Sequence, residues 1–390
     1  MEEKTNPVVS KTNPILSTRG LWFSYGEGKA ALSNVTLDIP KGKKIVFLGP
    51  NGSGKSTLFL HFNGVHRPDK GEVLFDGQAV KYDAKSLARL RSDVSLVFQN
   101  PDDQIFSATV EEDVAFGPLN SGVERAEIEK RVDEALHMVG LEELAERPTQ
   151  QLSFGQRKRV ALAGALAMKP KVLVMDEPTA GLDPQMVHEL LEMADELNHA
   201  GATVVISTHD VETAYEWADE VRAIHEGKIV FSGAPEEFFE REDMLLHEMG
   251  LTPPLVLSLN HSLHGLAGTP LKPYPRTLAE ATHKAFPKEG RKTGRLIVRC
   301  VDITKEMIAP AAHERSGIYG AAARRMAQDG KLNVHYRFHA LESGLMEAAS
   351  GRDFVLYTDS SLCNLAEEKA KRLERNSGVK VPIEHTHGQN

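Results

Sequence analysis

The residues best suited to chemistry form a glycine-rich loop directly after a short apolar run, Lys44–Leu48. The loop has the Gly-x-x-x-x-Gly-Lys-Ser spacing of a phosphate-binding loop between a strand and a helix. Its glycines let backbone N–H groups surround phosphate oxygens, and the helix that follows directs its positive end at them. Lys55 is expected to reach the β- and γ-phosphates and Ser56 to hold Mg²⁺. The predicted phosphate-binding residues are Gly49, Pro50, Asn51, Gly52, Ser53, Gly54, Lys55, Ser56 and Thr57.

A second group follows another strand-like run, 171–175, and consists of Asp176 and Glu177. Acids at the carboxyl end of a central parallel strand lie beside such a loop, where ligands bind in these sheets. Asp176 is placed to hold Mg²⁺, and Glu177 to orient or deprotonate the attacking water. Taken alone, the pair also fits a strand that runs into a turn. Together with the loop, it predicts hydrolysis of a nucleoside triphosphate.

Further motifs occur in a fixed order and resemble those of ABC ATPases. The segment Leu152-Ser-Phe-Gly-Gln is similar to the ABC signature LSGGQ, with Phe154 in place of its first glycine. In the same way, Gln99 resembles the Q-loop glutamine, Gly181-Leu-Asp the D-loop and His209 the switch histidine. Tyr25 resembles the aromatic residue that stacks on adenine.

The resemblance implies a head-to-tail dimer, with itself or with a related ATPase, that encloses ATP and Mg²⁺. Gln99 is expected to sense Mg²⁺, and His209 to contact the γ-phosphate and act with Glu177. Phe154 replaces a glycine that normally lets the backbone approach the nucleotide. Additional nucleotide contacts are expected from Ser153, Gly155, Gln156 and Asp183. Considered singly, His209 also fits a capping or buried histidine, and Tyr25 a strand-face aromatic.

Two stretches, 58–64 and 97–118, resemble the ATPases of energy-coupling factor importers, in particular those for cobalt and nickel. This resemblance implies uptake of Co²⁺ or Ni²⁺, with a vitamin importer as the alternative. It also implies that the segment after Gln99 receives a helix of a transmembrane subunit. The acidic residues there are expected to meet basic residues of that helix, or else are solvated loop charges: Asp102, Asp103, Glu111 and Glu112.

Charge, cysteine content and hydropathy exclude several other classes of protein. The net charge is −9, which argues against a nucleic-acid-binding surface as the main function. The two cysteines, Cys300 and Cys363, lie far apart and imply neither a disulfide framework nor a zinc site. No apolar stretch approaches the roughly 20 residues that cross a bilayer, and the first residues do not read as a signal peptide. The expected location is therefore peripheral, on the cytoplasmic face of the membrane.

Length and pattern predict two domains. The expected boundaries are 1–14 for a flexible lead-in, 15–242 for an ABC ATPase domain, 243–293 for a proline-rich connector and 294–390 for a small α/β domain. The ATPase core is expected to be α/β, with a parallel sheet around the phosphate loop. An antiparallel part is predicted near residues 15–40 and 70–80, and a helical subdomain near 100–165.

The C-terminal third contains no recognised motif. Strands are predicted at 296–302, 332–338, 353–357 and 380–383, and helices around 318–328, 341–349 and 361–376. His335, Arg337 and His339 would share a strand face, and His385 and His387 lie near the C-terminus. Such imidazoles suit Ni²⁺ or Co²⁺, which suggests a metal sensor. The alternatives are solvated histidines, a small regulatory ligand, or support of a dimer.

Two other classes of function fit part of the sequence. A soluble ABC ATPase acting on DNA or ribosomes usually carries coiled-coil insertions or two nucleotide-binding domains, and neither is evident here. A regulatory protein that binds ATP without turnover is disfavoured by the presence of Glu177 and His209.

Overall fold

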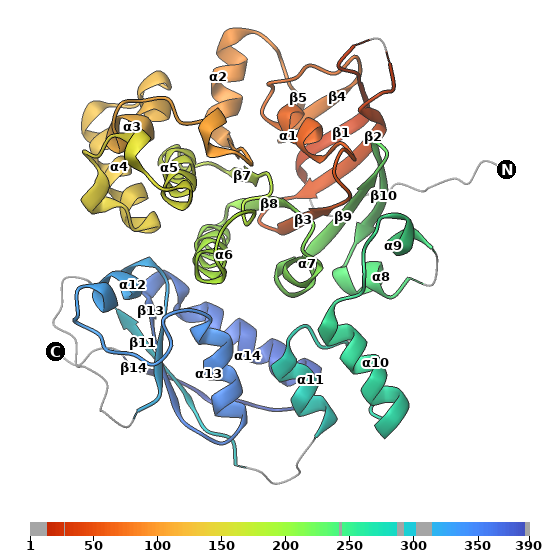
Figure 1. Cartoon of the computed structure of the whole chain (residues 1–390), viewed down its shortest axis with the longest axis vertical. Helices are drawn as coiled ribbons and strands as arrows, with labels where there is room; N and C mark the ends of the chain where they lie inside the picture. The colour runs from red at the N-terminus through yellow and green to blue at the C-terminus, as the bar shows by residue number, and fades with distance from the viewer. Residues whose placement is uncertain (1–13, 27, 242–243, 287–291, 302–313, 387–390) are drawn as a thin grey trace. The chain divides into compact units, whose positions relative to one another are not determined.

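The computed structural model describes residues 14–26, 28–241, 244–286, 292–301 and 314–386. These residues divide into two compact units (Figure 1). The first draws on residues 1–182 and 201–252, and the second on 183–200 and 253–390. The expected lead-in lies almost wholly outside the described residues, as do parts of the expected connector. The domain boundaries given above stay a prediction.

The first unit contains an antiparallel sheet with the strand order β2-β1-β4-β5. The sequence alternates between buried and exposed positions in β2, which is typical of a strand with one face in the core. This sheet confirms the antiparallel part expected near residues 15–40 and 70–80. Its strands are β1 (Pro14–Phe23), β2 (Leu32–Pro40), β4 (Lys70–Phe75) and β5 (Gln78–Ala79).

The second sheet of this unit has the order β10-β9-β3-β8-β7-β6. All neighbouring strands are parallel except the β9–β10 pair. Every residue of β6, β7 and β8 is buried, as expected for parallel strands covered on both faces. The strands are β3 (Lys44–Leu48), β6 (Val94–Val97), β7 (Val172–Met175), β8 (Thr203–Thr208), β9 (Glu220–His225) and β10 (Lys228–Gly233).

Helices α3, α4 and α5 pack together as the helical subdomain that the sequence predicts (Figure 1). Helix α3 begins with a capping box formed by Thr109 and Glu112, and α5 with one formed by Ser153 and Gln156. The helices of the unit are α1 (Lys55–Phe62), α2 (Ala84–Asp93), α3 (Val110–Asn120), α4 (Arg125–Val139), α5 (Phe154–Ala167), α7 (Val211–Trp217), α8 (Pro235–Phe239) and α9 (Leu245–Glu248), with short 3₁₀ turns η1 (Pro101–Asp103), η2 (Glu142–Leu144) and η3 (Thr149–Gln151).

The second unit is built on a parallel sheet with the order β12-β13-β11-β14. Alternate residues along β11 and β13 belong to two different apolar clusters, so both faces of the sheet are covered. Helices α13 and α14 contribute to one cluster and α12 to the other. The elements are α6 (Pro184–His199), α10 (Leu255–Ala267), α11 (Leu278–Ala285), β11 (Leu296–Val301), β12 (Ser316–Tyr319), α12 (Ala321–Gln328), α13 (Ala340–Ala349), β13 (Phe354–Asp359), η4 (Ser360–Leu362), α14 (Cys363–Ser377) and β14 (Ile383–Thr386).

Buried polar contacts join α6 to the elements around β12. Tyr319, the last residue of β12, donates a hydrogen bond of 3.1 Å to Asp195 on α6. Arg324 on α12 forms an ion pair with Glu192. Burial raises the pKa of Glu192 to about 8, although the Arg324 guanidinium opposes the rise. These contacts place ionisable groups in an interior where each polar atom needs a partner.

The structure differs from the expected pattern of the C-terminal third at three places. The predicted strand 332–338 is not formed, and only Tyr336 makes an isolated bridge to Gly317. The start of the predicted helix 318–328 belongs to β12, because Gly320, with φ +101°, separates that strand from α12. The edge strand lies at Ile383–Thr386, a few residues later than predicted.

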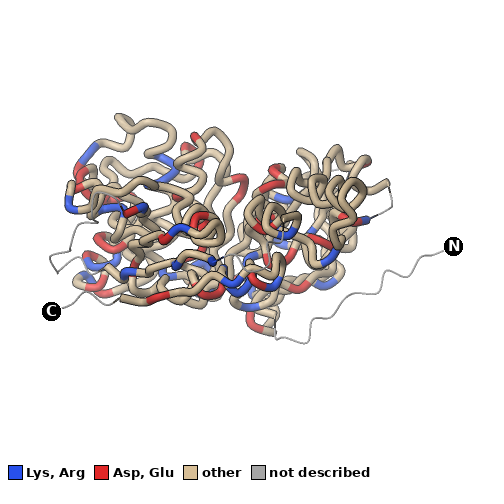
Figure 2. Tube along the Cα trace, turned by 90° about the horizontal axis from the view of Figure 1, so that it is seen from below, with Lys and Arg blue, Asp and Glu red and all other residues tan. Residues whose placement is uncertain are grey.

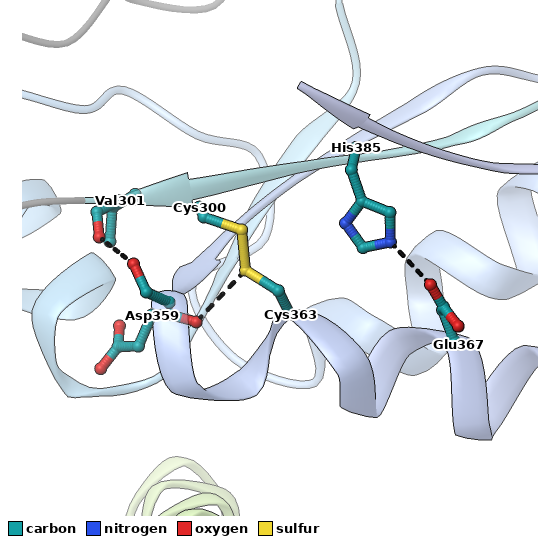
Figure 3. The surroundings of a disulfide bond; sticks show 7 residues. Cys300, Val301, Asp359, Cys363, Glu367 and His385 are labelled. Carbon is teal, nitrogen blue, oxygen red and sulfur yellow. Dashed lines mark hydrogen bonds and ion pairs between the residues drawn. A yellow bond between two sulfur atoms is a disulfide. The ribbon is translucent and has the colours of Figure 1, made fainter. Parts of the chain in front are cut away.

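The histidines of the suggested metal sensor are therefore not on one strand face. His335 accepts a hydrogen bond from the Ser316 N–H, and His339 precedes α13 in the left-handed region, φ +55°. His385 contacts Glu367 at 3.0 Å (Figure 3). His387 lies outside the described residues. Within the described part of the chain, no three His, Cys, Asp or Glu side chains are grouped so that they could hold a metal ion.

Cys300 and Cys363 form a disulfide (Figure 3), which corrects the expectation drawn from their separation in the sequence. Cys300 lies on β11 and Cys363 begins α14, and their Cα atoms are 6.3 Å apart. Sixty-three positions separate the two residues, but the packing of α14 against β11 brings them together. Sequence spacing alone carries no information about this proximity.

Lysine and arginine residues are interspersed with aspartate and glutamate along the described trace (Figure 2). Many of these charges form exposed pairs, which contribute little to stability. The pair between Glu342 on α13 and Lys369 on α14 is different, because its side chains are only 16% and 11% exposed. Although burial disfavours the carboxylate, the Lys369 ammonium lowers the pKa of Glu342 to about 2. The charged pair therefore persists in the folded state.

Lys369→Met is expected to destabilise the second unit by roughly 3–5 kcal/mol, because Glu342 would be left as a buried, unpaired charge. Faster amide hydrogen exchange in β13 would report this loss. Adding Glu342→Leu should restore most of the protection. In the native chain the pair's contribution is present above the unfolded pKa of about 4.3 and is lost as the pH falls through about 2.

Lys371→Met is the matched control, since Lys371 forms an exposed pair with Glu367 on the same helix. Equal exchange in the Lys369 and Lys371 variants would contradict a structural role for the buried pair.

Candidate functional site

Three parallel strands of the first unit end at the same edge of the sheet, and each is followed by predicted site residues. The phosphate loop follows β3, Asp176 and Glu177 follow β7, and His209 follows β8. Because β8 lies between β3 and β7, these residues come from adjacent strand ends. Their position fits the rule that ligands bind outside the carboxyl ends of parallel strands.

Two glycines of the loop occupy positions that exclude a side chain. Gly54, the residue before α1, has φ +108°, and a Cβ there would lie 2.8 Å from the Ala31 carbonyl oxygen. A Cβ on Gly49 would lie 2.3 Å from the Ile224 carbonyl oxygen. The spacing of the sequence motif thus has a steric cause in this fold. Around them, Asn51, Gly52 and Ser56 are exposed, whereas Ser53 and Thr57 are buried.

Lys55 is buried at the centre of the site. Its ammonium donates hydrogen bonds to the carbonyl oxygens of Gly49 (2.7 Å) and Pro50 (3.2 Å). It also lies 3.9 Å from Oε1 of Glu177. Burial lowers the pKa of Lys55, and the negative charges of Glu177 and Asp176 oppose this shift. The cation therefore depends on acceptors that surround it.

Ser207, on β8, ties the two acids to their neighbouring strand. Its hydroxyl donates to Asp176 Oδ1 at 2.5 Å and accepts from the Glu177 N–H at 2.8 Å. Glu177 has φ +43°, a left-handed conformation that costs a non-glycine residue about 1–2 kcal/mol. The hydrogen bond to Ser207 helps to hold this conformation.

The carboxylate of Glu177 lies between two basic side chains. Oε1 is near Lys55, and Oε2 is 3.4 Å from Nδ1 of His209. The carboxylate is 10% exposed, whereas the imidazole of His209 is 69% exposed. One oxygen thus faces the buried phosphate loop and the other a histidine open to solvent. A group held in this way can accept a proton from water bound beside it.

Tyr25 and Gln99 lie at the margins of this cluster. The Tyr25 hydroxyl is 3.0 Å from the Thr57 hydroxyl, and its ring packs edge-on against Phe23 and His66. The residue is 67% exposed, which leaves ring surface for a planar ligand. Gln99 is exposed and follows β6, the strand beside β7.

The signature residues lie at the start of α5, where Ser153 is the N-cap. The Ser153 hydroxyl accepts from the Gln156 N–H at 3.3 Å, and Oε1 of Gln156 accepts from the Ser153 N–H at 2.9 Å. Ser153 and Phe154 are exposed, so the positive end of this helix is open to an anionic partner. Asp183 belongs to the second unit, where it caps α6 through a hydrogen bond from the Met186 N–H.

Sequence reasoning missed two residues of the site, Ser207 and Lys158. Ser207 is a fully buried hydroxyl on β8, and such a group needs a partner. Lys158 is a buried lysine on α5 that donates to backbone carbonyls between Glu177 and Ala180. The available signal for Ser207 was a hydroxyl that directly follows the buried apolar run 204–206. The sequence offers no comparable signal for Lys158.

Comparison with known proteins shows which family the chain resembles. Residues 32–180 match the family model described as ABC transporter. The chain is 54% identical over 225 residues to the energy-coupling factor transporter ATP-binding protein EcfA of Methanocaldococcus jannaschii, which covers 58% of this chain and 81% of the relative. It is 36% identical over 382 residues to EcfA2 of Methanospirillum hungatei, which covers 95% of this chain and 96% of that one.

The solved structures that are similar to the chain are also ABC transporter subunits or ATP-binding cassettes. CbiO1 from Clostridium perfringens, part of the ABC transporter complex CbiONQ, is 43% identical, with a TM-score of 0.54 over 60% of this chain and 94% of that chain. A dimeric ATP-binding cassette in a post-hydrolysis state with ADP and Pi is 31% identical, with a TM-score of 0.53 over 56% of this chain and 98% of the other.

Ser207→Ala is expected to lower the rate of ATP hydrolysis by about tenfold or more, because Asp176 and the Glu177 backbone lose a shared partner (one unsatisfied buried group costs about 1–3 kcal/mol). Steady-state turnover at saturating ATP measures the effect. Thr208→Val is a neighbouring control, since Thr208 contacts the Asp210 N–H instead. Native turnover in Ser207→Ala would show that the hydroxyl does not support the acids.

Proposed function

The chain belongs to the ABC transporter family, among the energy-coupling factor ATP-binding proteins, and we propose that it powers uptake of cobalt or nickel ions through a partner transmembrane complex. Its activity is ATP hydrolysis of the ABC type. The observation that carries the ATP-hydrolysing part of the proposal is the cluster of Lys55, Glu177 and His209 at the carboxyl ends of three adjacent parallel strands.

In the proposed reaction, the chain's own residues bind the triphosphate and direct water at it. Phosphate oxygens replace the carbonyl oxygens of Gly49 and Pro50 as partners of the Lys55 ammonium. Glu177, held beside Lys55 and His209, accepts a proton from the attacking water. His209 contacts the γ-phosphate from the solvent side of the carboxylate. Tyr25 stacks on the adenine.

The residues expected to hold Mg²⁺ fit that ion by their chemistry. Ser56 offers a hydroxyl, Asp176 a carboxylate and Gln99 an amide oxygen, and Mg²⁺ prefers oxygen ligands. Asp176 is buried and oriented by Ser207, as expected for a carboxylate that must keep one position. When bound, the ion neutralises charge that develops on the phosphates. Few protein ligands suffice, because phosphates and waters complete its coordination.

A head-to-tail dimer would complete each nucleotide site. The exposed N-terminus of α5, with Ser153 as its cap, offers N–H groups and positive potential to a γ-phosphate held by another chain. Gly155 leaves backbone accessible there, and Gln156 is proposed to contribute at the same interface. Asp183, in the second unit, stays a predicted nucleotide contact. The partner is a second copy or a related ATPase. The likeness to a dimeric cassette with ADP and Pi supports this arrangement.

The segment after Gln99 is the proposed docking surface for a helix of the transmembrane partner. Phe106 and Phe116 are 63% and 45% exposed, and their rings pack edge to face with centroids 4.4 Å apart. Of the acids expected to meet the partner, Asp102 pairs with Arg157 and Glu112 completes the cap of α3. The aromatic pair is therefore the proposed centre of this surface, and Asp103 and Glu111 are the remaining acids proposed to meet the partner.

Membrane association is proposed to occur through this contact, with the chain peripheral on the cytoplasmic face. Among the described residues, no helix has both the length and the apolar character needed to cross a membrane. The cobalt or nickel substrate is supported by the two stretches 58–64 and 97–118 and by the likeness to CbiO1. A vitamin substrate is the alternative, since the energy-coupling factor relatives are named without a substrate.

Phe106→Ser is expected to weaken binding to the transmembrane partner by roughly 2 kcal/mol or more, because an exposed aromatic anchor is lost from an interface. Co-purification with the membrane complex measures the effect, while ATP hydrolysis by the isolated chain should remain native. Met244→Ser, at another exposed apolar position of the first unit, is the control. If both variants bind as the native chain does, the surface is assigned wrongly.

Uptake tests the substrate directly. The chain is produced with its membrane components, and cells carrying native protein or Glu177→Gln are compared for accumulation of radioactive cobalt and nickel. ATP-dependent uptake of either metal should fall by about 100-fold or more in the variant, because a general base is removed. ATP hydrolysis by the native chain without metal uptake would refute the metal proposal and direct the search to vitamins.

A further inference from the structure

Lys158 lies at a point where the signature helix meets the turn that follows Glu177. It is the fifth residue of α5 and is only 6% exposed. Its ammonium donates to the carbonyl oxygens of Ala180 (2.6 Å), Pro178 (3.1 Å) and Glu177 (3.4 Å). One side chain thus satisfies three acceptors of a single turn.

The backbone of Glu177 is held from two directions. Its N–H donates to the Ser207 hydroxyl on β8, and its carbonyl oxygen accepts from Lys158 on α5. Between these contacts the residue adopts φ +43°, which a non-glycine residue keeps only when its surroundings impose it. The direction of the Glu177 carboxylate follows from this backbone conformation.

We propose that Lys158 is a positioning residue that fixes the turn 177–180 and thereby aims the Glu177 carboxylate at the attacking water. This role rests on the proposed function of Glu177 as the base. Helix α5, which begins with the signature residues, then also determines where the base of the same subunit lies. Lys158 itself touches neither water nor nucleotide in this role.

Charge and packing agree with the proposed function of Lys158. Three acceptors match the three N–H groups of an ammonium, whereas a neutral amine has two. Burial lowers the pKa of Lys158 to about 8, while the facing Glu177 carboxylate opposes the shift, so the ammonium predominates at pH 7. Its nitrogen lies 5.4 Å from the centroid of the Phe154 ring, a cation–π contact.

Phe154, which replaces the first glycine of the usual signature, also packs beside the turn that Lys158 contacts. A Cβ on Gly181 would lie 3.1 Å from its ring, so the ring packs directly over the end of the turn. Gly181 has φ +74°, which also favours glycine. The aromatic ring thus lies against both the lysine and the end of the turn.

The test compares Lys158→Met with Lys158→Arg in the full chain. Methionine keeps the length of the side chain but removes every donor, so kcat should fall by about 100-fold, as expected for a misplaced catalytic group. KM for ATP should stay within about twofold, because nucleotide binding is not altered. Arginine restores a cation with several N–H donors and should recover kcat to within about tenfold of native.

Arg159→Met is the matched control. Arg159 is the next residue of α5 and also donates to a backbone carbonyl, that of Val139 on α4, away from the turn. Its loss should leave kcat near native. If Lys158→Met retains native kcat, or if it raises KM alone, the positioning role is refuted. An equal loss of kcat in Arg159→Met would refute it as well.

A second variant covers the case in which Lys158→Met does not fold. Lys158→Gln keeps two N–H donors but not the charge, and a folded protein with lowered kcat and unchanged KM is expected. Native kcat in this variant would overturn the proposal. Glu177→Gln tests the proposed function of Glu177 separately from the positioning role of Lys158. If that variant hydrolyses ATP at the native rate, the proposed function of Glu177 fails, whatever the Lys158 variants show.

Discussion

A buried ammonium, that of Lys55, is the constraint on which the catalytic edge of the sheet depends. A charge removed from water must be surrounded by acceptors, or it loses its proton or destabilises the fold. The carbonyl oxygens of Gly49 and Pro50 and the carboxylate of Glu177 provide these acceptors. The loop can pack as closely as it does against the Ile224 and Ala31 carbonyls only with glycine at positions 49 and 54. Residues that follow two strands, β3 and β7, are therefore brought together around one cation, which phosphate oxygens are suited to satisfy.

Two buried lysines contact different groups of Glu177. Lys55 lies beside its carboxylate, whereas Lys158 binds its backbone carbonyl. Ser207 fixes the N–H of the same residue. A residue in an unfavourable backbone conformation is thus held at each polar group, which is the arrangement expected where the direction of a side chain matters more than local stability. The phosphate loop, the signature helix and strand β8 each contribute a contact to this single residue.

Much of the first unit could be predicted from the sequence because its signals are local. The phosphate loop, the acids after β7 and the histidine after β8 each follow a short apolar run, and strand order places their ends together. Lys158 escaped prediction because its acceptors are backbone carbonyls about twenty residues away, which no side-chain pattern reveals. Ser207 follows a short apolar run, but its two partners depend on the register between β7 and β8.

The second unit was less predictable, again for physical reasons. The run 332–338 alternates as a strand does, yet it lies beside β12 with only Tyr336 in a bridge. The pairing of Cys300 with Cys363 depends on how α14 packs against β11. Its interior contains ion pairs such as Glu342 with Lys369, which specify how helices meet rather than add stability over apolar packing. These features arise from tertiary packing, and residue spacing does not encode them.

The most direct measurement compares ATP binding and single-turnover hydrolysis in purified native chain and in Glu177→Gln. Both proteins should bind ATP with similar affinity, since Lys55 and the loop are intact, while hydrolysis in the variant should be slower by about 100-fold or more. Hydrolysis at equal rates in the two proteins would contradict the assignment of Glu177 as the base around which the site is organised.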